Sequence, residues 1–335
     1  DMTNEFSGVG VQITRKDGRL AIDSLLEDSP AFKAGLDAGD IIAAVDGKST
    51  DTLSMNMAVD LITGPAGTDV VLTIEREGEE PKDYTITRQK IVVKTVKGLY
   101  RDEAGQWQYF VDPAEGIAYI RLTNFAGETC ERLQAVIAEL RGQNLKGLIL
   151  DLRNNSGGYL NAALAISNMF LNDGEAIVST RPRDTRYSQY EYAAKDQTTE
   201  PTLPLVVLID GTSASASEIV AGALADNHRA VLVGARSFGK GSVQTIQNFR
   251  SSNAEMKLTI AYYYLPGGRR VHRDLDAPPD ADYGVMPNIE VELTADQFMA
   301  VYETRNDAAV LYQNGEEEHP AFTAERILDL SLIHI

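Results

Sequence analysis

The chain has 335 residues and a mass of 36.5 kDa, which corresponds to about two domains of ordinary size. Hydrophobic residues make up 43% of it, enough for each domain to bury a core. The formal charge of -18 argues against a protein that binds nucleic acids or anionic membranes. One cysteine excludes an internal disulfide framework, and the 4 histidines are too scattered for a metal centre. We therefore expect protein or small-molecule partners and no cofactor.

The two ends of the sequence lack the usual terminal signals. No apolar run is long enough to span a membrane, and the chain opens at Asp1 without the charged and apolar regions of an export signal. We expect any export signal to lie upstream. The last residues, 330–335, have no turn or cap pattern and resemble read-through of a sequencing adapter, so we exclude them from fold reasoning.

Residues 6–92 read as short strands with two helices, which predicts one small domain. Apolar and polar residues alternate on both sides of the turn at Asp17-Gly18, as in a β-hairpin. Ser29 followed by Pro30 predicts the start of a short helix. A second helix, with apolar residues at helical spacing, is ended by Gly64-Pro65.

Residues 93–312 have a different rhythm, in which apolar strands alternate with longer helices. This pattern is typical of an α/β core whose sheet is covered on both faces. Residues 181–200 are polar, rich in tyrosine and without a clear period, so we expect an inserted lid or loop there. Residues 313–335 are expected to be a C-terminal tail. The expected strands cover 116–125, 146–152, 203–210 and 230–235, and the expected helices cover 128–143, 159–171 and 217–226.

The strongest candidate for chemistry is Ser215, in the run between a buried strand and a helix. A serine on such a turn projects its hydroxyl beyond the edge of the sheet, and the free N–H groups at the helix start can hold an oxyanion. A second reading is structural, because Ser215 and Glu218 also match a helix capping box. From these residues alone, the capping role is the more common outcome.

A nucleophilic serine needs a base, and Lys240 is one candidate because the flanking glycines let the backbone approach closely. An unperturbed lysine is almost fully protonated near neutral pH, so a basic Lys240 must lie in a dry cleft away from carboxylates. Phe238 is expected to help exclude water. Gln244, four residues later, is expected on the same face of a strand, where its neutral amide would orient the amine. The rival base, His228, is more simply explained as a histidine at a helix C-terminus.

A third turn follows the apolar strand that ends near Asp151 and contains the pair Gly157 and Gly158. Paired glycines before a helix can present N–H groups to a substrate carbonyl. The alternatives are a plain turn and a phosphate cradle, although the turn lacks the lysine and threonine of a P-loop.

Taken together, the segments 151–158, 211–224 and 238–244 resemble the C-terminal processing peptidases, also called tail-specific proteases, a serine-lysine family with an embedded PDZ domain. The 25 residues between Ser215 and Lys240 match the spacing in that family. The resemblance implies that Ser215 is the nucleophile, Lys240 the base and Gln244 its partner. It further implies an oxyanion hole built from the backbone N–H groups of Ala216 and of Gly157 or Gly158.

The resemblance also implies a fold, a PDZ domain followed by a crotonase-like α/β serine-protease core. In the PDZ domain, the backbone of Gly8, Val9, Gly10 and Val11 would receive the C-terminal carboxylate of a peptide, which adds a strand to the sheet edge. Met57 and Leu61 on the second helix would line the peptide groove, although a role in core packing is about as plausible.

The function implied is a serine endopeptidase that recognises protein C-terminal tails and cleaves through an acyl-enzyme, without a metal. The alternative is a non-catalytic peptide-binding adaptor in which Ser215 only caps its helix. Family members are exported to the periplasm or cell envelope and often dimerise through terminal segments, so export and a homo-oligomer are further expectations. The physiological substrate does not follow from the sequence.

Overall fold

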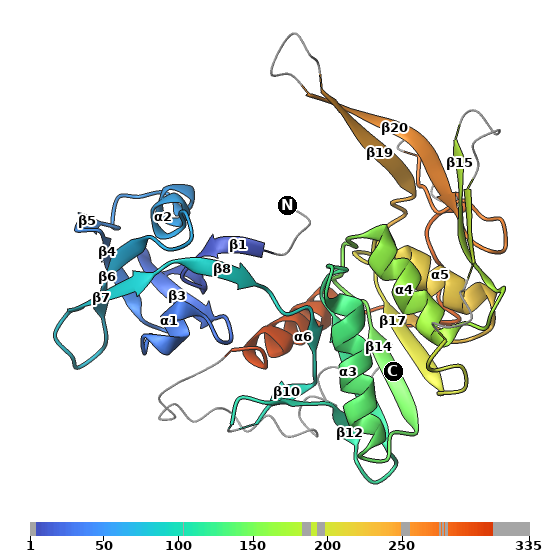
Figure 1. Cartoon of the computed structure of the whole chain (residues 1–335), viewed down its shortest axis with the longest axis horizontal. Coiled ribbons are helices and arrows are strands. Elements are labelled where there is room, and N and C mark those ends of the chain that lie inside the picture. Colours follow the sequence, from blue (N-terminus) through green and yellow to red (C-terminus); the bar gives the residue numbers. More distant parts are fainter. Residues whose placement is uncertain are drawn as a thin grey trace.

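A computed structural model describes residues 5–102, 104–182, 189–192, 198–248, 255–274, 276, 278 and 281–310 (Figure 1). It contains an N-terminal unit of short strands, an α/β core and a β-sheet arm that projects from the core. The expected tail, 313–335, lies outside the described residues. Within the described residues, no helix is both long and apolar enough to cross a membrane.

The N-terminal unit is built on a six-stranded sheet with the order β2-β3-β4-β6-β7 and β5 paired to β4, beside a two-stranded ribbon β1-β8. Ser29 caps the first short helix, as the sequence predicts, by accepting the Phe32 N–H at 3.2 Å. Ser54 caps the second helix in the same way. Buried aliphatic residues from both helices and the sheet form its core. The elements are β1 (Glu5–Gly8), β2 (Val11–Lys16), β3 (Arg19–Leu25), α1 (Pro30–Lys33), β4 (Ile41–Val45), β5 (Lys48–Ser49), α2 (Met55–Ile62), β6 (Asp69–Glu75), β7 (Lys82–Thr87) and β8 (Gln89–Val92).

The core has a central sheet with the order β12-β13-β14-β17-β18-β21, to which β9 adds by pairing with β13. Strands β13, β14, β17, β18 and β21 run parallel, and β12 and β9 run antiparallel to β13. The bounds are β9 (Val96–Lys97), β10 (Tyr100–Arg101), β11 (Trp107–Gln108), β12 (Phe110–Asp112), β13 (Ile117–Leu122), β14 (Gly147–Asp151), β17 (Leu205–Ile209), β18 (Val231–Gly234) and β21 (Ile289–Glu290). The α/β class predicted from the alternation of strands and helices is confirmed.

Helices cover both faces of this sheet. The helices α3 (Thr129–Arg141), α4 (Leu160–Phe170) and α5 (Ala216–Asp226) share one apolar cluster with alternate residues of β13, β14 and β17. On the other face, α6 (Ala295–Asp307) lies between the core and the N-terminal unit in Figure 1. There Phe298 and Val301 line a cavity of about 240 Å³ together with Leu208 and Val233. Thr294 caps α6 in a capping box with Gln297.

A four-stranded antiparallel sheet, with the order β16-β15-β20-β19, forms the projecting arm (Figure 1). Its strands are β15 (Ala176–Pro182), β16 (Gln189–Tyr192), β19 (Ser242–Asn248) and β20 (Glu255–Tyr264). The expectation of a lid or loop at 181–200 is therefore partly wrong. Residues 181–182 end β15 and residues 189–192 form β16, and β15 pairs with both β16 and β20. Residues 183–188 and 193–197 of that segment lie outside the described residues. The pairs β15–β16 and β19–β20 are local in the sequence, but the sheet is completed by the pairing of β15 with β20, which are far apart in the sequence.

Candidate active site

Ser215 stands at the junction of β17 and α5, where parallel strands end and their following loops meet. Its backbone has φ 56° and ψ -113°, a conformation that is uncommon for a residue with a side chain. Such strain is typical of functional turns and is held in place by the surrounding contacts. Ser215 and Glu218 form the predicted capping box, in which the Glu218 carboxylate accepts the Ser215 N–H at 2.7 Å. The capping role is therefore present, and the strained backbone of Ser215 is the feature that capping alone does not require.

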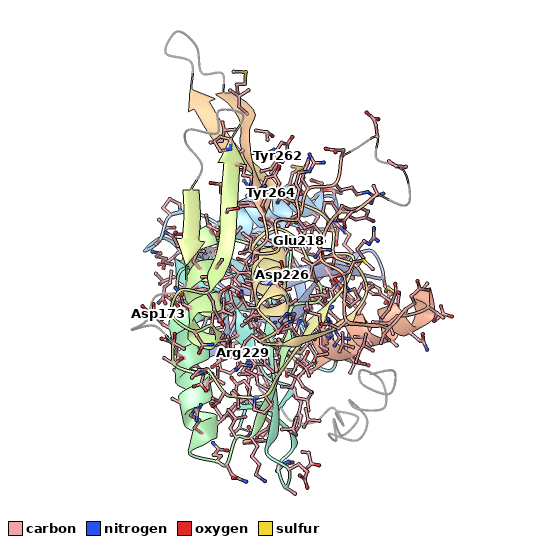
Figure 2. The ribbon with its side chains drawn as sticks, turned by 90° about the vertical axis from the view of Figure 1, so that its right-hand side faces the viewer. Asp173, Glu218, Asp226, Arg229, Tyr262 and Tyr264 are labelled. Carbon is pink, nitrogen blue, oxygen red and sulfur yellow. The ribbon has the colours of Figure 1, made fainter. Side chains whose placement is uncertain are left out.

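Glu218 links the serine turn to the lysine loop. Its carboxylate is fully buried and accepts four hydrogen bonds, from the Ser215 N–H at 2.7 Å, the Lys240 N–H at 2.8 Å, the Gly239 N–H at 2.7 Å and the Ser237 hydroxyl at 2.6 Å. Burial raises the pKa of Glu218, and the four donors oppose that rise. Figure 2 shows Glu218 on α5 near the base of the arm, which Tyr262 and Tyr264 mark.

The loop that carries Lys240 is fixed by further bonds. The Phe238 N–H donates to the Ser213 carbonyl at 3.0 Å, and the Ser237 hydroxyl accepts the Val285 N–H at 2.7 Å. The glycine before Lys240 cannot be replaced freely, because a Cβ on Gly239 would lie 2.8 Å from side-chain atoms of Arg273 and Tyr283. The sequence argument that the flanking glycines permit close approach is thus confirmed for Gly239.

The side chain of Lys240 does not occupy the dry cleft that the sequence argument requires. The residue is exposed, and Phe238 is itself 55% exposed, so the expected shelter is absent in this conformation. Among the described residues, the Lys240 amine makes no ion pair or hydrogen bond. The condition that no carboxylate clamps the amine is met. What brings Ser215 and Lys240 together is the shared bond of their backbones to Glu218, and the two side chains are not hydrogen-bonded to each other.

Gln244 is placed differently from the expectation. The strand β19 begins only at Ser242, so Lys240 lies in the preceding loop, and strand alternation cannot be counted from it. The register also shifts between Val243 and Gln244, which disrupts alternation further. Gln244 is exposed and has no hydrogen bond to Lys240 within the described part of the chain. The prediction that Lys240 and Gln244 share a strand face was therefore wrong.

The turn with the paired glycines packs directly against Ser215. A Cβ on Gly157, whose φ is +106°, would lie 2.8 Å from the Ser215 Cβ and 3.0 Å from the Ala216 nitrogen. Only glycine fits this position. The carbonyl of Asn155 joins the two turns by accepting the Ala214 N–H at 3.0 Å and the Ser217 hydroxyl at 2.8 Å. The two turns that the sequence analysis singled out separately thus form one surface.

The backbone donors around this surface differ in availability. The Gly157 N–H is taken by the side-chain oxygen of Asn155 at 2.9 Å, so it is not free for an oxyanion in this conformation. The N–H groups of Gly158 and Ala216 have no hydrogen-bond partner among the described residues. Of the two glycines that the resemblance offered, Gly158 is therefore the one with an open donor.

A buried ion cluster supports the glycine turn from the other side. Asp151, fully buried, accepts the Arg153 guanidinium at 2.9 Å, the Arg305 guanidinium at 2.6 Å and the Tyr119 hydroxyl at 2.5 Å. Burial alone would raise the pKa of Asp151, but the two guanidinium groups outweigh it and hold that pKa far below its usual range. Because Arg305 belongs to α6, this helix is tied to the turn.

His228 lies at the wrong end of α5 to serve Ser215. The helix has 11 residues between them, which places His228 roughly 16 Å along the axis from the serine. It lines an open hollow with Arg229 and Asn288 on the far side of the core. The reading of His228 as a histidine at a helix C-terminus fits this position.

In the N-terminal unit, Gly8 ends β1, Val9 and Gly10 link β1 to β2, and Val11 opens β2. The N–H groups of Val9 and Gly10 have no hydrogen-bond partner within the described residues, whereas their carbonyls accept the Ala31 and Leu26 N–H groups at 2.9 Å. Two adjacent free donors are the arrangement that a carboxylate needs. Gly10 cannot carry a side chain, because its Cβ would lie 2.3 Å from Ser29 Cβ.

The two predicted groove residues on α2 have different surroundings. Met57 is 53% exposed, so it is free to contact a ligand. Leu61 is half-buried against the core of the N-terminal unit. The structure is thus compatible with a groove role for Met57 and gives Leu61 a packing role as well.

Sequence reasoning missed two residues of the site. Glu218 was seen only as half of a capping box, which explains its bond to the Ser215 N–H but not its bonds to the loop at 237–240. Asn155 was passed over as an ordinary turn residue. A glutamate and an asparagine predicted to be buried next to a candidate nucleophile are the signal that would have drawn attention to them.

Comparisons with known proteins agree with the domains and the site described above. A model of peptidase family S41 matches residues 116–291, and a PDZ-domain model matches residues 22–76. The carboxy-terminal-processing protease of Bartonella bacilliformis is 42% identical over 294 residues, covering 86% of this chain and 62% of that protein. The carboxyl-terminal-processing protease of Synechocystis sp. is 35% identical over 316 residues, covering 93% of this chain and 68% of that protein.

A solved structure of a protein described as an S41 protease, from Bacteroides fragilis, superposes with a TM-score of 0.56 at 18% identity, covering 88% of this chain and 78% of that one. This likeness shows the shared fold. The fold and the site define a PDZ domain joined to an α/β core that presents a serine on a strand-to-helix turn, next to a lysine loop. The chain belongs to peptidase family S41, and the expected resemblance is confirmed.

Proposed function

We propose that this chain is a serine endopeptidase that binds the C-terminal tails of proteins through its PDZ domain and cleaves peptide bonds with Ser215. The observation that carries the proposal is the Glu218 carboxylate, which fixes the backbones of Ser215 and Lys240 on one buried anchor. A serine that only capped a helix would need no lysine loop beside it. The names of the relatives from Bartonella and Synechocystis, both processing proteases, support the same activity.

The proposed reaction has two steps. Lys240, in its neutral form, takes the proton of the Ser215 hydroxyl as the oxygen attacks a peptide carbonyl, and the oxyanion is held by the N–H groups of Ala216 and Gly158. Lys240 then returns the proton to the leaving amine, so an acyl-enzyme remains. A water molecule, activated by the same amine, releases the acid and restores Ser215.

The exposed Lys240 implies that the described conformation is a resting one. Base catalysis by a lysine needs an amine sheltered from water, and the exposed Lys240 lacks that shelter here. We propose that a substrate strand laid over the site covers Lys240 and lets Gln244 approach it. Binding of a tail to the PDZ domain would thus promote catalysis by delivering the strand that completes the site.

The tail-binding surface is the turn at Gly8 to Val11, next to Met57. Its free N–H groups suit a terminal carboxylate, and the exposed thioether of Met57 suits an apolar side chain. We propose apolar protein C-termini as substrates. We also propose export to the periplasm or cell envelope, as in the family that the chain resembles, and leave its oligomeric state to measurement by light scattering.

Incubation with an unfolded reporter protein that ends in apolar residues tests the activity. We expect cleavage by the unmutated chain and by Lys146→Ala, an exposed lysine far from the site that serves as the matched control. Ser215→Ala and Lys240→Ala should be inactive while still binding the tail peptide. If the unmutated chain binds the peptide with normal affinity and cleaves nothing, the adaptor alternative is correct instead.

A further inference from the structure

A small cavity at the start of the core is lined by three cationic side chains. Lys97 on β9, Arg121 on β13 and Arg305 on α6 surround it, together with Trp107 and Tyr119. Its volume is about 20 Å³, enough for roughly one water-sized occupant. The cavity lies outside the catalytic surface, on the face of the sheet that α6 covers.

Two of these three cationic groups, Lys97 and Arg121, have no carboxylate partner among the described residues, whereas Arg305 is paired with Asp151. Lys97 and Arg121 are direct partners in the antiparallel pairing of β9 and β13, a position where two like charges destabilise a sheet. Arg121 has no ion pair or hydrogen bond among the described residues. Burial lowers the pKa of Lys97 to about 8, with further lowering by the charges of Arg121 and Arg101.

The carboxylates near the cavity are already occupied. Asp151 binds both Arg153 and Arg305, so one negative charge faces two guanidinium groups. Glu27 of the N-terminal unit pairs with Arg101 and Lys94. Within the described residues, neither leaves a charge to offset Lys97 or Arg121.

Two guanidinium N–H groups beside the cavity have no acceptor among the described residues. The Nε atoms of Arg121 and Arg305 are inaccessible to solvent and have no hydrogen-bond partner within the described part of the chain. The Arg305 side chain is only 8% exposed, so it cannot turn out to water. A buried donor without an acceptor is costly, and two such donors on cationic groups favour an anion over a neutral molecule.

We propose that this cavity is an anion site that binds one chloride-sized ion between β9, β13 and α6. The size of the cavity excludes phosphate and sulfate, which need more space than one water molecule. The bound ion would offset the like charges of Lys97 and Arg121 and would accept hydrogen bonds from the Lys97 amine and the Arg121 guanidinium. Because β9 directly follows the last strand of the PDZ domain, the ion would also fix the segment that joins the two domains.

The test compares thermal unfolding of the whole chain in sodium chloride and in sodium gluconate at equal ionic strength, so that general screening is the same in both. At a chloride concentration tenfold above its Kd, we expect the midpoint of thermal unfolding to be about 3 to 6 °C higher than in gluconate. In gluconate, only the general effect of ionic strength should remain. Arg121→Gln should remove the difference between the two salts, whereas Lys146→Gln, the exposed control, should keep it.

Crystals soaked in sodium bromide give a readout that needs no variant. An anomalous peak inside the cavity, beside the Lys97 amine and the Arg121 guanidinium, is the expected result. Equal midpoints in both salts together with an empty or water-filled cavity would overturn the proposal. So would density for a carboxylate of this chain occupying the cavity.

Discussion

Ser215 and Lys240 are joined through a single oxygen atom, because Glu218 Oε2 accepts the backbone N–H of Ser215 at 2.7 Å and that of Lys240 at 2.8 Å. The second oxygen, Oε1, holds the Ser237 hydroxyl and the Gly239 N–H. The distance between the serine turn and the lysine loop is thus set by the size of one carboxylate. The bond from the Phe238 N–H to the Ser213 carbonyl is a second link between the lysine loop and the serine turn.

Replacing Glu218 should therefore affect turnover more than tail binding. Glu218→Ala leaves four buried donors without an acceptor, and we expect the free energy of unfolding to fall by about 3 kcal/mol and kcat by at least about 100-fold. Glu218→Gln keeps one oxygen acceptor, so its free energy of unfolding and its kcat should lie between those of Glu218→Ala and the unmutated chain. Urea unfolding and cleavage assays check this, with the exposed Glu139→Gln as control. Unchanged kcat in Glu218→Ala would refute the anchor.

Gly157 tests the contact between the two turns. Gly157→Ala places a methyl group 2.8 Å from the Ser215 Cβ and from the Ala214 carbonyl oxygen, so we expect the serine to shift and cleavage to fall by roughly 100-fold. Gly174 has a similar positive φ, +83°, but nothing within 4 Å of an added Cβ. Gly174→Ala should lose about 1 kcal/mol of stability and keep its activity. Equal activity losses in the two variants would mean that the contact is irrelevant.

The strained backbone of Ser215 predicts an unusual order of stabilities. Alanine at φ 56° and ψ -113° keeps the strain, whereas glycine relieves it. We expect Ser215→Gly to be more stable than Ser215→Ala by about 1 kcal/mol, the reverse of the order inside a helix, and both to be inactive. Chemical denaturation of the two variants measures the difference. If alanine is the more stable, the turn carries no strain.

The buried Lys97 predicts how stability depends on pH. Its folded pKa of about 8 lies below the unfolded value near 10.5, so the unfolded chain binds more protons between these limits and stability should increase with pH across them. Below pH 8 the folded chain carries the full free-energy cost of holding a protonated Lys97 in its buried position, up to about 3 kcal/mol. In gluconate at pH 7, Lys97→Met should be more stable than the unmutated chain. Its free energy of unfolding should also increase less between pH 8 and pH 10.5. Urea titrations at several pH values measure this dependence. If Lys97→Met and the unmutated chain show the same change of unfolding free energy with pH, the prediction is contradicted.

The local elements of this protein could be predicted from its sequence, because their signals are local. Ser29 caps its helix as expected, and the apolar run that ends near Asp151 is the expected buried strand. The turns at Gly157 and Ser215 were recognisable from glycine and serine positions alone. Their contact with each other follows from the parallel order of β14 and β17, which the alternation of strands and helices implies.

The remaining features depend on contacts between distant residues. The four bonds of Glu218 span up to 22 positions, and the pairing of β15 with β20 spans more, so no periodicity reveals them. The face of Gln244 was mispredicted because β19 starts after Lys240 and contains a register shift. The exposure of Lys240 likewise depends on what covers the loop, which the sequence of the loop does not encode.

The most direct test of the central claim is to trap the acyl-enzyme. The chain is mixed with an activated p-nitrophenyl ester of an apolar peptide, quenched in acid and digested, and the adduct is located by mass spectrometry. We expect the acyl group on Ser215 in the unmutated chain, far less of it in Lys240→Ala and none in Ser215→Ala. Product release without an adduct on Ser215, or an undiminished adduct in Ser215→Ala, would contradict Ser215 as the nucleophile.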